Sequence, residues 1–349
     1  MIPEIIPEIA KRTIDLAVTA PSADNSQPWR FVNRGDHWEV VYHHAGSKDL
    51  FGPTGHATLL STGALCYNLE QICGTNNTSS SIDALGNWRL SFVPPDRISE
   101  AMESALRQRH TNRHPFIGSI INSPIEQIAA GNQIKLQFIS EPAPIRKVAE
   151  AIRICSELRF KNEELHKWLF SSLRWSPSEA EIGDGLDLRT LHLPPGGRGF
   201  MKFISSWPRM SILNLLGISK IMALVDSLPV RNAPALIVIS SKKEPGLTWQ
   251  AGHTLAEIWT KLNRMGVAVH PYYVITDMAH RLQRGELDEA AAGFAQKALA
   301  LSRNVLNLEA DELPHIVLRI GYPTAHSERS KRKSADSFII ESQLDSLQP

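Results

Sequence analysis

A polar loop held between two prolines is the first group of residues suited to chemistry. The segment Ala20-Pro-Ser-Ala-Asp-Asn-Ser-Gln-Pro28 follows a predicted helix and precedes the apolar run Trp29-Arg-Phe-Val32. Its hydroxyl and amide side chains place several hydrogen-bond donors and acceptors at the end of that helix. The loop therefore suits the binding of a polar ligand. A hydrogen-bonded helix-to-strand connection, with Trp29 anchored in the core, is the alternative interpretation.

Two basic segments are the second group. Arg107-Gln-Arg-His-Thr-Asn-Arg-His-Pro-Phe116 holds three arginines and a threonine, which suit a phosphate site because guanidinium groups donate in pairs and the hydroxyl adds a donor. Glu328-Arg-Ser-Lys-Arg-Lys333 follows Gly321-Tyr-Pro323. A solvated turn and a solvated tail are the alternative interpretations of these two segments.

Other kinds of site have little support. The sequence contains no phosphate-binding G-x-x-x-x-G-K-[ST], no dinucleotide-binding G-x-G-x-x-G and no nucleophile motif G-x-S-x-G. His110 and His114 have the spacing of one helix face, but Pro115 ends a helix there and no acidic ligand accompanies them. We therefore predict no metal site.

The composition excludes several classes of protein. The 349 residues carry 37 Lys and Arg against 36 Asp and Glu, a net charge of +1, whereas nucleic-acid binding needs a basic excess. Three cysteines in no paired spacing indicate reduced thiols and a cytoplasmic protein. No apolar run reaches the length of a membrane span. The most apolar stretch, 200–225, is interrupted by charges and proline and is interpreted as an amphipathic segment or lid.

The elements that position these segments follow from hydrophobic periodicity and turn residues. Helices are predicted at about 5–20, 59–73, 99–108, 145–160, 163–172, 250–264 and 286–301. Strands are predicted at 29–32, 37–42, 87–93, 234–240 and 315–322, with a polar loop at 75–81 and an apolar run at 267–275. Helices around a few strands, twice over, predict an α+β protein with antiparallel-rich sheets and an internal duplication.

Together the segments resemble the FMN-dependent nitroreductase family. Four of its marks occur in order: the A-P-S-x-x-N-S-Q-P-W-x-F loop; the R-x-[ST]-x-R turn with Phe116; the helix Gln250-Ala-Gly-His leading to Gly266-Val-Ala-Val-His-Pro271; and the C-terminal Gly-Tyr-Pro with its basic cluster. The resemblance covers most of the chain outside about 156–230. One departure is His253, where many relatives have glutamine.

The order of these marks resembles the double-length, Acg-like branch of the family. In ordinary nitroreductases, which are homodimers, the arginine turn precedes the A-P-S loop, and here it follows it. The resemblance implies two nitroreductase-like halves, 1–108 and 109–349, that imitate the dimer and share one FMN site. Residues 156–230 would be an insertion that can fold over the flavin. The chain would be a monomeric pseudo-dimer or a homodimer.

The resemblance also implies roles for individual residues. Pro21, Ser22, Asn25 and Gln27 would lie beside the isoalloxazine ring and ribityl chain. Arg109, Thr111 and Arg113 would hold the phosphate, with Lys331 or Arg332 from the tail. Pro271, Tyr272 and Tyr273 would lie against the other side of the ring.

The expected function is that of an FMN-dependent oxidoreductase that transfers hydride through the flavin N5. Its substrate would be a small organic molecule, either a nitro or quinone compound reduced with NADPH or NADH, or a natural-product intermediate that is dehydrogenated. No protein nucleophile is required. The alternatives are a flavin-sequestering protein whose lid blocks turnover, and a flavin-free relative that serves as a partner subunit.

Overall fold

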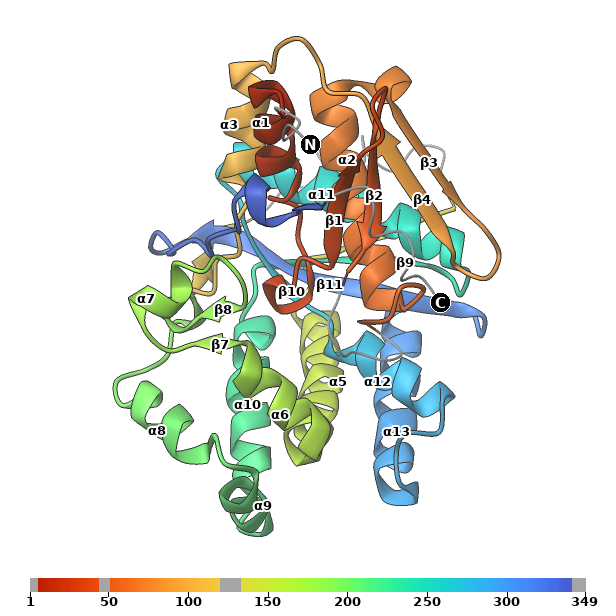
Figure 1. Cartoon of the computed structure of the whole chain (residues 1–349). Helices are drawn as coiled ribbons and strands as arrows, with labels where there is room; N and C mark the ends of the chain where they lie inside the picture. The colour runs from red at the N-terminus through yellow and green to blue at the C-terminus, as the bar shows by residue number, and fades with distance from the viewer. Residues whose placement is uncertain (1–5, 44–50, 120–132, 341–349) are drawn as a thin grey trace.

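The computed structural model describes residues 6–43, 51–119 and 133–340 and contains two antiparallel-rich sheets (Figure 1). The first sheet has the order β12-β1-β2-β4-β3, with β1 (Trp29–Asn33), β2 (Trp38–Tyr42), β3 (Thr78–Ile82), β4 (Trp88–Phe92) and β12 (Ile339–Ile340). The second has the order β10-β11-β9-β6, with β6 (Lys135–Ile139), β9 (Ala235–Lys242), β10 (Ala268–Tyr272) and β11 (Glu312–Pro323), and β5 (Phe116–Ile117) pairs with β11. The predicted α+β class is confirmed.

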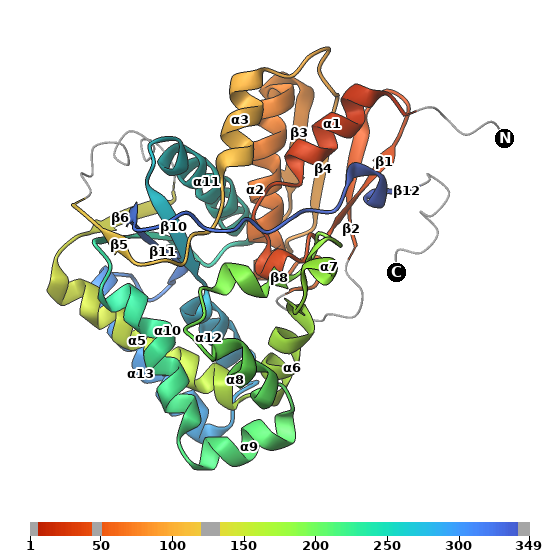
Figure 2. The ribbon, with the colours of Figure 1, turned by 90° about the vertical axis from the view of Figure 1, so that its left-hand side faces the viewer.

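The two sheets repeat one connection pattern. In each, four strands follow one another along the chain, a long helix separates the second strand from the third, and the strands pair in the order first, second, fourth, third. The helix is α2 (His56–Cys73) in the first unit and α11 (Pro245–Arg264) in the second. Figures 1 and 2 show these two helices side by side between the sheets.

Helix α2 is buried on nearly every side, as a helix without a polar face must be. Its partner α11 packs along it and closes the core of the second sheet. α1 (Glu8–Ala17) and α3 (Glu100–Gln108) flank α2 in the first unit. Beside the second sheet lie α12 (Val274–Gln283) and α13 (Glu289–Leu306).

The second unit differs from the first in one long connection. Residues 34–37 form a hairpin between β1 and β2, whereas residues 140–234 separate β6 from β9. This connection contains α5 (Pro142–Lys161), α6 (Glu163–Ser172), β7 (Leu173–Arg174), α7 (Pro177–Ala180), β8 (Leu186–Asp187), α8 (Gly197–Ile204), α9 (Trp207–Leu215) and α10 (Ile218–Arg231). The insertion predicted at 156–230 therefore begins inside α5, whose buried face packs on the second sheet.

Local signals explain where several of these helices begin and end. Pro142 opens α5 at a position where a missing N–H costs nothing. The side chains of Asn162 and Asp288 accept backbone N–H bonds at the first turns of α6 and α13. Asn307 ends α13 in the left-handed conformation, with φ of 45°.

The chain beyond β11 returns to the first sheet. It crosses the molecule and adds β12 parallel to β1 (Figure 2), with Phe31 N–H donating to the carbonyl of Phe338 at 2.9 Å. The Phe338 ring is fully buried and meets the Phe31 ring edge-on, with centroids 6.3 Å apart. Burial of such a ring contributes about 2 kcal/mol to stability.

Several elements differ from the predictions. Residues 75–81 were expected to be a loop, but β3 pairs with β4 there as a serine-rich, largely exposed strand. The apolar run 267–275 contains all of β10 and the beginning of α12. The helix expected at about 5–20 is α1, and Ile5 lies outside the described residues. In the described part of the chain no single helix is long and apolar enough to cross a membrane; α9 and α10 would pass such a test together but are bent by 94°.

Candidate functional site

A cavity of about 870 Å³ lies where the two units and the insertion meet, and its size is that of a small-molecule or cofactor site. The proline-bounded loop, the arginine turn, the start of α12, the tail after β11 and the insertion all contribute to its wall. Of the twelve site residues proposed from the sequence, all except Gln27 line it: Pro21, Ser22, Asn25, Arg109, Thr111, Arg113, Pro271, Tyr272, Tyr273, Lys331 and Arg332.

Two arginines meet at the C-terminal end of α1. Arg109 donates from Nη2 to the carbonyl of Thr19 at 2.6 Å, and Arg332 donates from Nε to the carbonyl of Val18 at 3.1 Å. The Arg109 guanidinium also lies 4.7 Å from the centre of the Trp259 ring. These contacts hold both guanidinium groups in place, since a helix C-terminus attracts cations.

The charges of this arginine pair are poorly compensated. Burial lowers the pKa of Arg332 to about 10, and burial together with the nearby Arg332 charge holds the pKa of Arg109 well below its usual range. Within the described residues, neither guanidinium has a carboxylate partner and Arg109 Nε has no hydrogen-bond acceptor. An anion bound beside the pair would relieve both deficits.

Arg113 lies in different surroundings. Its Nη1 donates to the carbonyl of Thr190 in the insertion at 3.1 Å, and burial lowers its pKa although Asp24 and Asp226 oppose the shift. The structure therefore brings Arg109 to Arg332 and gives Arg113 a separate part of the cavity wall. Thr111 lines the cavity and forms a backbone bridge with Val269 of β10.

The proline-bounded loop is strained. Asp24, Asn25 and Gln27 have φ of 48°, 59° and 51°, a region that residues other than glycine adopt at a cost. Ser22 Oγ stabilises the turn by accepting from the Gln27 N–H at 3.1 Å. Strain of this kind, about 1–3 kcal/mol per residue, is concentrated at functional sites.

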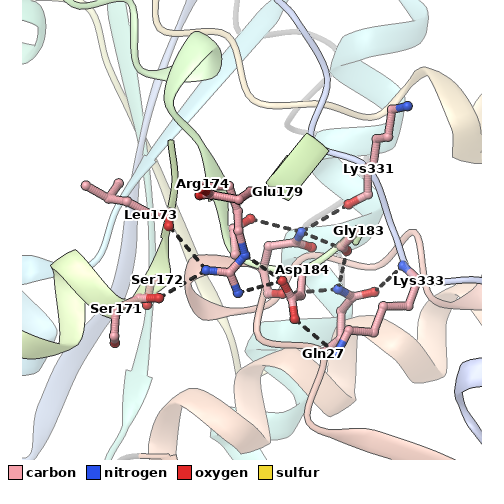
Figure 3. A network of polar contacts seen from close by, with 12 residues as sticks. Gln27, Ser171, Ser172, Leu173, Arg174, Glu179, Gly183, Asp184, Lys331 and Lys333 are labelled. Carbon is pink, nitrogen blue, oxygen red and sulfur yellow. Dashed lines mark hydrogen bonds and ion pairs between the residues drawn. The ribbon is translucent and has the colours of Figure 1, made fainter. Parts of the chain in front are cut away.

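The insertion and the tail hold the loop in this form. The Asn25 Nδ2 donates to the carbonyls of Gly185 at 3.1 Å and Lys331 at 3.0 Å, and Gln27 Nε2 donates to that of Gly183 at 2.9 Å (Figure 3). Gln27 is therefore turned into this network and away from the cavity. The Lys331 side chain points away from Gln27 and pairs with Glu181.

An aromatic contact closes the same side of the cavity. Trp168 of α6 donates from Nε1 to Asp24 Oδ2 at 2.8 Å, and its ring stacks on Phe51 with centroids 4.6 Å apart. All three residues line the cavity. The insertion therefore covers the proline-bounded loop, as a lid would.

Behind Tyr273, which lines the cavity, lies a buried chain of hydrogen bonds that the sequence analysis did not predict. Tyr273 shares a hydrogen bond of 2.8 Å with His56 Nδ1, His56 Nε2 lies 2.9 Å from His315 Nδ1, and His315 Nε2 lies 2.6 Å from Ser241 Oγ. Burial lowers the pKa of His56 and His315 and raises that of Tyr273. These histidines are far apart in sequence and follow no motif spacing.

His253, the departure noted in the sequence, does not line the cavity. Its Nε2 lies 2.8 Å from Glu70 Oε2 at the surface of the α2–α11 pair. It therefore serves the contact between the two helices.

This chain is similar to several known proteins. No family model matches the sequence. The chain is 22% identical over 307 residues to the uncharacterised protein MT1398 of Mycobacterium tuberculosis, covering 80% of this chain and 40% of that protein. It is 23% identical over 197 residues to a candidate NAD(P)H nitroreductase of the same organism, Acg, covering 51% of this chain and 57% of that protein. A nitroreductase structure with bound FMN from Bacteroides fragilis aligns with a TM-score of 0.38 and 10% identity, covering 68% of this chain and 96% of that one.

The resemblance to Acg-type nitroreductases is confirmed by the second relative. The chain spans less than two thirds of the length of both Mycobacterium tuberculosis proteins.

Proposed function

We propose that the chain binds FMN in this cavity and acts as an oxidoreductase on a small organic molecule. The observation that carries the proposal is the arginine pair Arg109 and Arg332, which is buried, anchored on α1 and without a carboxylate partner among the described residues. The similarity to a candidate NAD(P)H nitroreductase supports the same reading.

The residues present fit this cofactor. A phosphate monoester is a compact dianion, and two guanidinium groups with unused N–H donors are the ligands that proteins use for it. The buried Asn25 Oδ1 also has no hydrogen-bond partner in the described structure, so the loop retains an acceptor for a polar ligand. Tyr272 and Tyr273, which line the cavity, supply apolar surface for a planar ring.

The chain's own residues would then bind the cofactor, orient it and enclose it. Arg109 and Arg332 would hold the phosphate, while Pro21, Ser22 and Asn25 would face Pro271, Tyr272 and Tyr273 across the ring. When bound, FMN supplies hydride transfer through its N5 position. Trp168 and Phe51 would exclude water from that side, and the buried Tyr273 hydroxyl would keep its proton on the hydrogen bond to His56.

The proposal identifies the electron donor and the substrate by chemical class. NADPH or NADH would reduce a nitro or quinone compound through the site, or a natural-product intermediate would be dehydrogenated there. The cavity has room for a cofactor together with a small substrate, because its volume is near the upper end of the range for ligand pockets.

We also infer that the two units arose by duplication within one chain, with halves near 1–108 and 109–349. The repeated strand order with one central helix in each unit supports this inference. In the second half the connection between β6 and β9 would carry the insertion, at the place where the first half has a hairpin.

A second candidate function is flavin storage. The network of Gln27, Asn25 and Gly183, with the contacts of Trp168, ties the insertion to the loop and could keep a nicotinamide from the ring. The two functions share the bound flavin and differ in access to it.

An absorbance spectrum tests the proposal. The purified protein should show flavin bands or acquire them when incubated with FMN, and NADPH or NADH added without oxygen should bleach them. Bands that stay unbleached with both nucleotides would favour storage, or an enzyme that takes electrons from its organic substrate. A colourless protein that does not take up FMN would contradict both functions.

A further inference from the structure

Helices α8, α9 and α10 of the insertion carry many large apolar residues that are exposed. Leu215 and Leu216 have exposed fractions of 87% and 75%. The α8–α10 apolar surface, as we call it, consists of Phe200, Phe203, Ile212, Leu215, Leu216, Ile221, Leu224 and Val225. Soluble proteins rarely leave so many large apolar side chains exposed on adjacent turns, and such surfaces mark interaction sites.

These residues are not a core exposed by poor packing. Each of the three helices has a separate buried side, with Met201 and Ile204 of α8 and Met210 of α9 enclosed in a small core of the insertion. The exposed apolar face is therefore separate from the buried face that packs in the core of the insertion. Figures 1 and 2 show α8 and α9 at the end of the molecule opposite the β3–β4 hairpin.

The charge of this segment has one sign. From residue 188 to residue 225 the sequence contains no aspartate or glutamate. Its exposed cations include Arg198, Lys202, Arg209 and Lys220, which lie on the same helices or just before them. The one acidic residue of α8, α9 and α10 is Asp226, which lines the cavity and accepts a hydrogen bond from Ser156. An apolar face whose exposed charges are cations is the pattern of helices that lie in the interface of an anionic bilayer.

We propose that the α8–α10 apolar surface docks on a lipid bilayer that carries anionic lipids. The apolar side chains would enter the boundary between head groups and acyl chains, and the cations would pair with phosphate head groups. The bend of 94° between α9 and α10 suits docking on the surface, since a bent pair cannot span as one helix. This proposal does not depend on the bound cofactor.

A second copy of the chain is a poorer occupant. A two-fold dimer through this face would bring Lys202, Arg209 and Lys220 against the same cations of the other copy, without acidic partners in the segment. An anionic membrane offers the complementary charge.

Docking would place one wall of the cavity beside the membrane. Met222 and Asp226 of α10 line the cavity, while Ile221 and Val225 on the same helix are exposed. An apolar substrate dissolved in the bilayer would then lie one helix away from the site.

Sedimentation with vesicles tests the proposal on the full-length protein. Vesicles of phosphatidylcholine mixed with phosphatidylglycerol should carry the protein down, more weakly as salt is added, and vesicles of phosphatidylcholine alone should carry down much less. The double variant Leu215→Glu, Leu216→Glu should bind at least roughly tenfold more weakly, because both side chains would enter the bilayer. Leu85→Glu, at an equally exposed leucine with 78% exposure outside the surface, should bind like the unchanged protein.

Light scattering during gel filtration completes the test, and circular dichroism confirms that each variant is folded. Failure of the unchanged protein to bind anionic vesicles would overturn the proposal, as would equal binding by the double variant. A dimer that the double variant loses, without any vesicle binding, would assign the surface to a second copy instead.

Discussion

Gly63 of α2 and Gly252 of α11 occupy reciprocal positions where the two helices cross. A Cβ at position 63 would lie 2.0 Å from the carbonyl oxygen of Trp249, three residues before Gly252. A Cβ at position 252 would lie 2.0 Å from the carbonyl oxygen of Leu60, three residues before Gly63. Reciprocal contacts of this kind are the mark of a two-fold axis, and they support the inference that one chain imitates a dimer.

Alanine at either glycine should destabilise the protein. Gly63→Ala or Gly252→Ala would force α2 and α11 apart, since the obstacle is backbone, and the cost should be at least about 1–3 kcal/mol in the free energy of unfolding. Gly293→Ala in α13, where nothing lies within 4 Å of the new Cβ, should instead be neutral or stabilise by about 0.5–1 kcal/mol. Urea unfolding measures all three. Equal stability of the three variants would disprove the close crossing.

Removing either arginine of the pair should weaken flavin binding. A buried charge-assisted contact to phosphate is worth about 1.5–3 kcal/mol, so Arg109→Gln and Arg332→Gln should each weaken FMN binding roughly tenfold to a hundredfold. Arg146→Gln, at an exposed position on α5, should bind like the unchanged protein. Fluorescence titration of the flavin-free protein gives the dissociation constants. If both cavity variants bind FMN with full affinity, the phosphate does not bind at this end of the cavity.

The Trp168 contacts should control how fast flavin leaves. Trp168→Phe keeps a ring against Phe51 but loses the bond to Asp24, and Trp168→Ala loses both. We expect release to accelerate a few-fold in the first variant, for a bond worth about 1 kcal/mol, and further in the second. Stopped-flow fluorescence after dilution measures the rate. Rates that match the unchanged protein in both variants would show that the insertion does not retain the flavin.

Stability should fall on mild acidification because buried histidines resist protonation. Burial, together with the nearby Arg284 and Lys243 charges, lowers the pKa of His280 to about 4. Between about pH 6.5 and pH 4 the unfolded chain binds a proton there that the folded chain does not, so the free energy of unfolding decreases as pH falls. His280→Gln should reduce the slope of the unfolding free energy against pH by the equivalent of up to one bound proton. Denaturant unfolding at several pH values measures this slope. An unchanged slope would mean that His280 takes up its proton as readily in the folded protein as in the unfolded chain.

Much of the fold was predictable because its signals are local. The hairpin of β1 and β2, the largely apolar α2 and the apolar β9 are each indicated by a few consecutive residues, and the structure confirms all three. By contrast, β3 is a serine-rich strand whose formation depends on pairing with β4. Periodicity alone could not separate β10 from α12, since both fall within one apolar run.

The candidate site was predictable as a set of segments but not as a set of contacts. The motifs nominated eleven residues that line one cavity. The resemblance placed Arg109 with Lys331 or Arg332 at one phosphate, but it did not reveal that Arg109 and Arg332 are anchored on the end of α1 or that Gln27 turns toward Gly183. These contacts join segments that are far apart in the sequence. The hydrogen-bonded chain of His56 and His315 has no sequence signature for the same reason.

The path of the tail sets the order in which the protein can be completed during synthesis. Arg332 bonds to Val18 and β12 pairs with β1, and both follow the last strand of the second sheet along the chain. After the first unit has left the ribosome, the edge of β1 stays unpaired until residues 339–340 have emerged. Arg109 likewise lacks Arg332 until that part of the tail has been made. The nascent chain therefore cannot hold an anion between Arg109 and Arg332 at an early stage, and its open strand edge is exposed to chaperones in the interval.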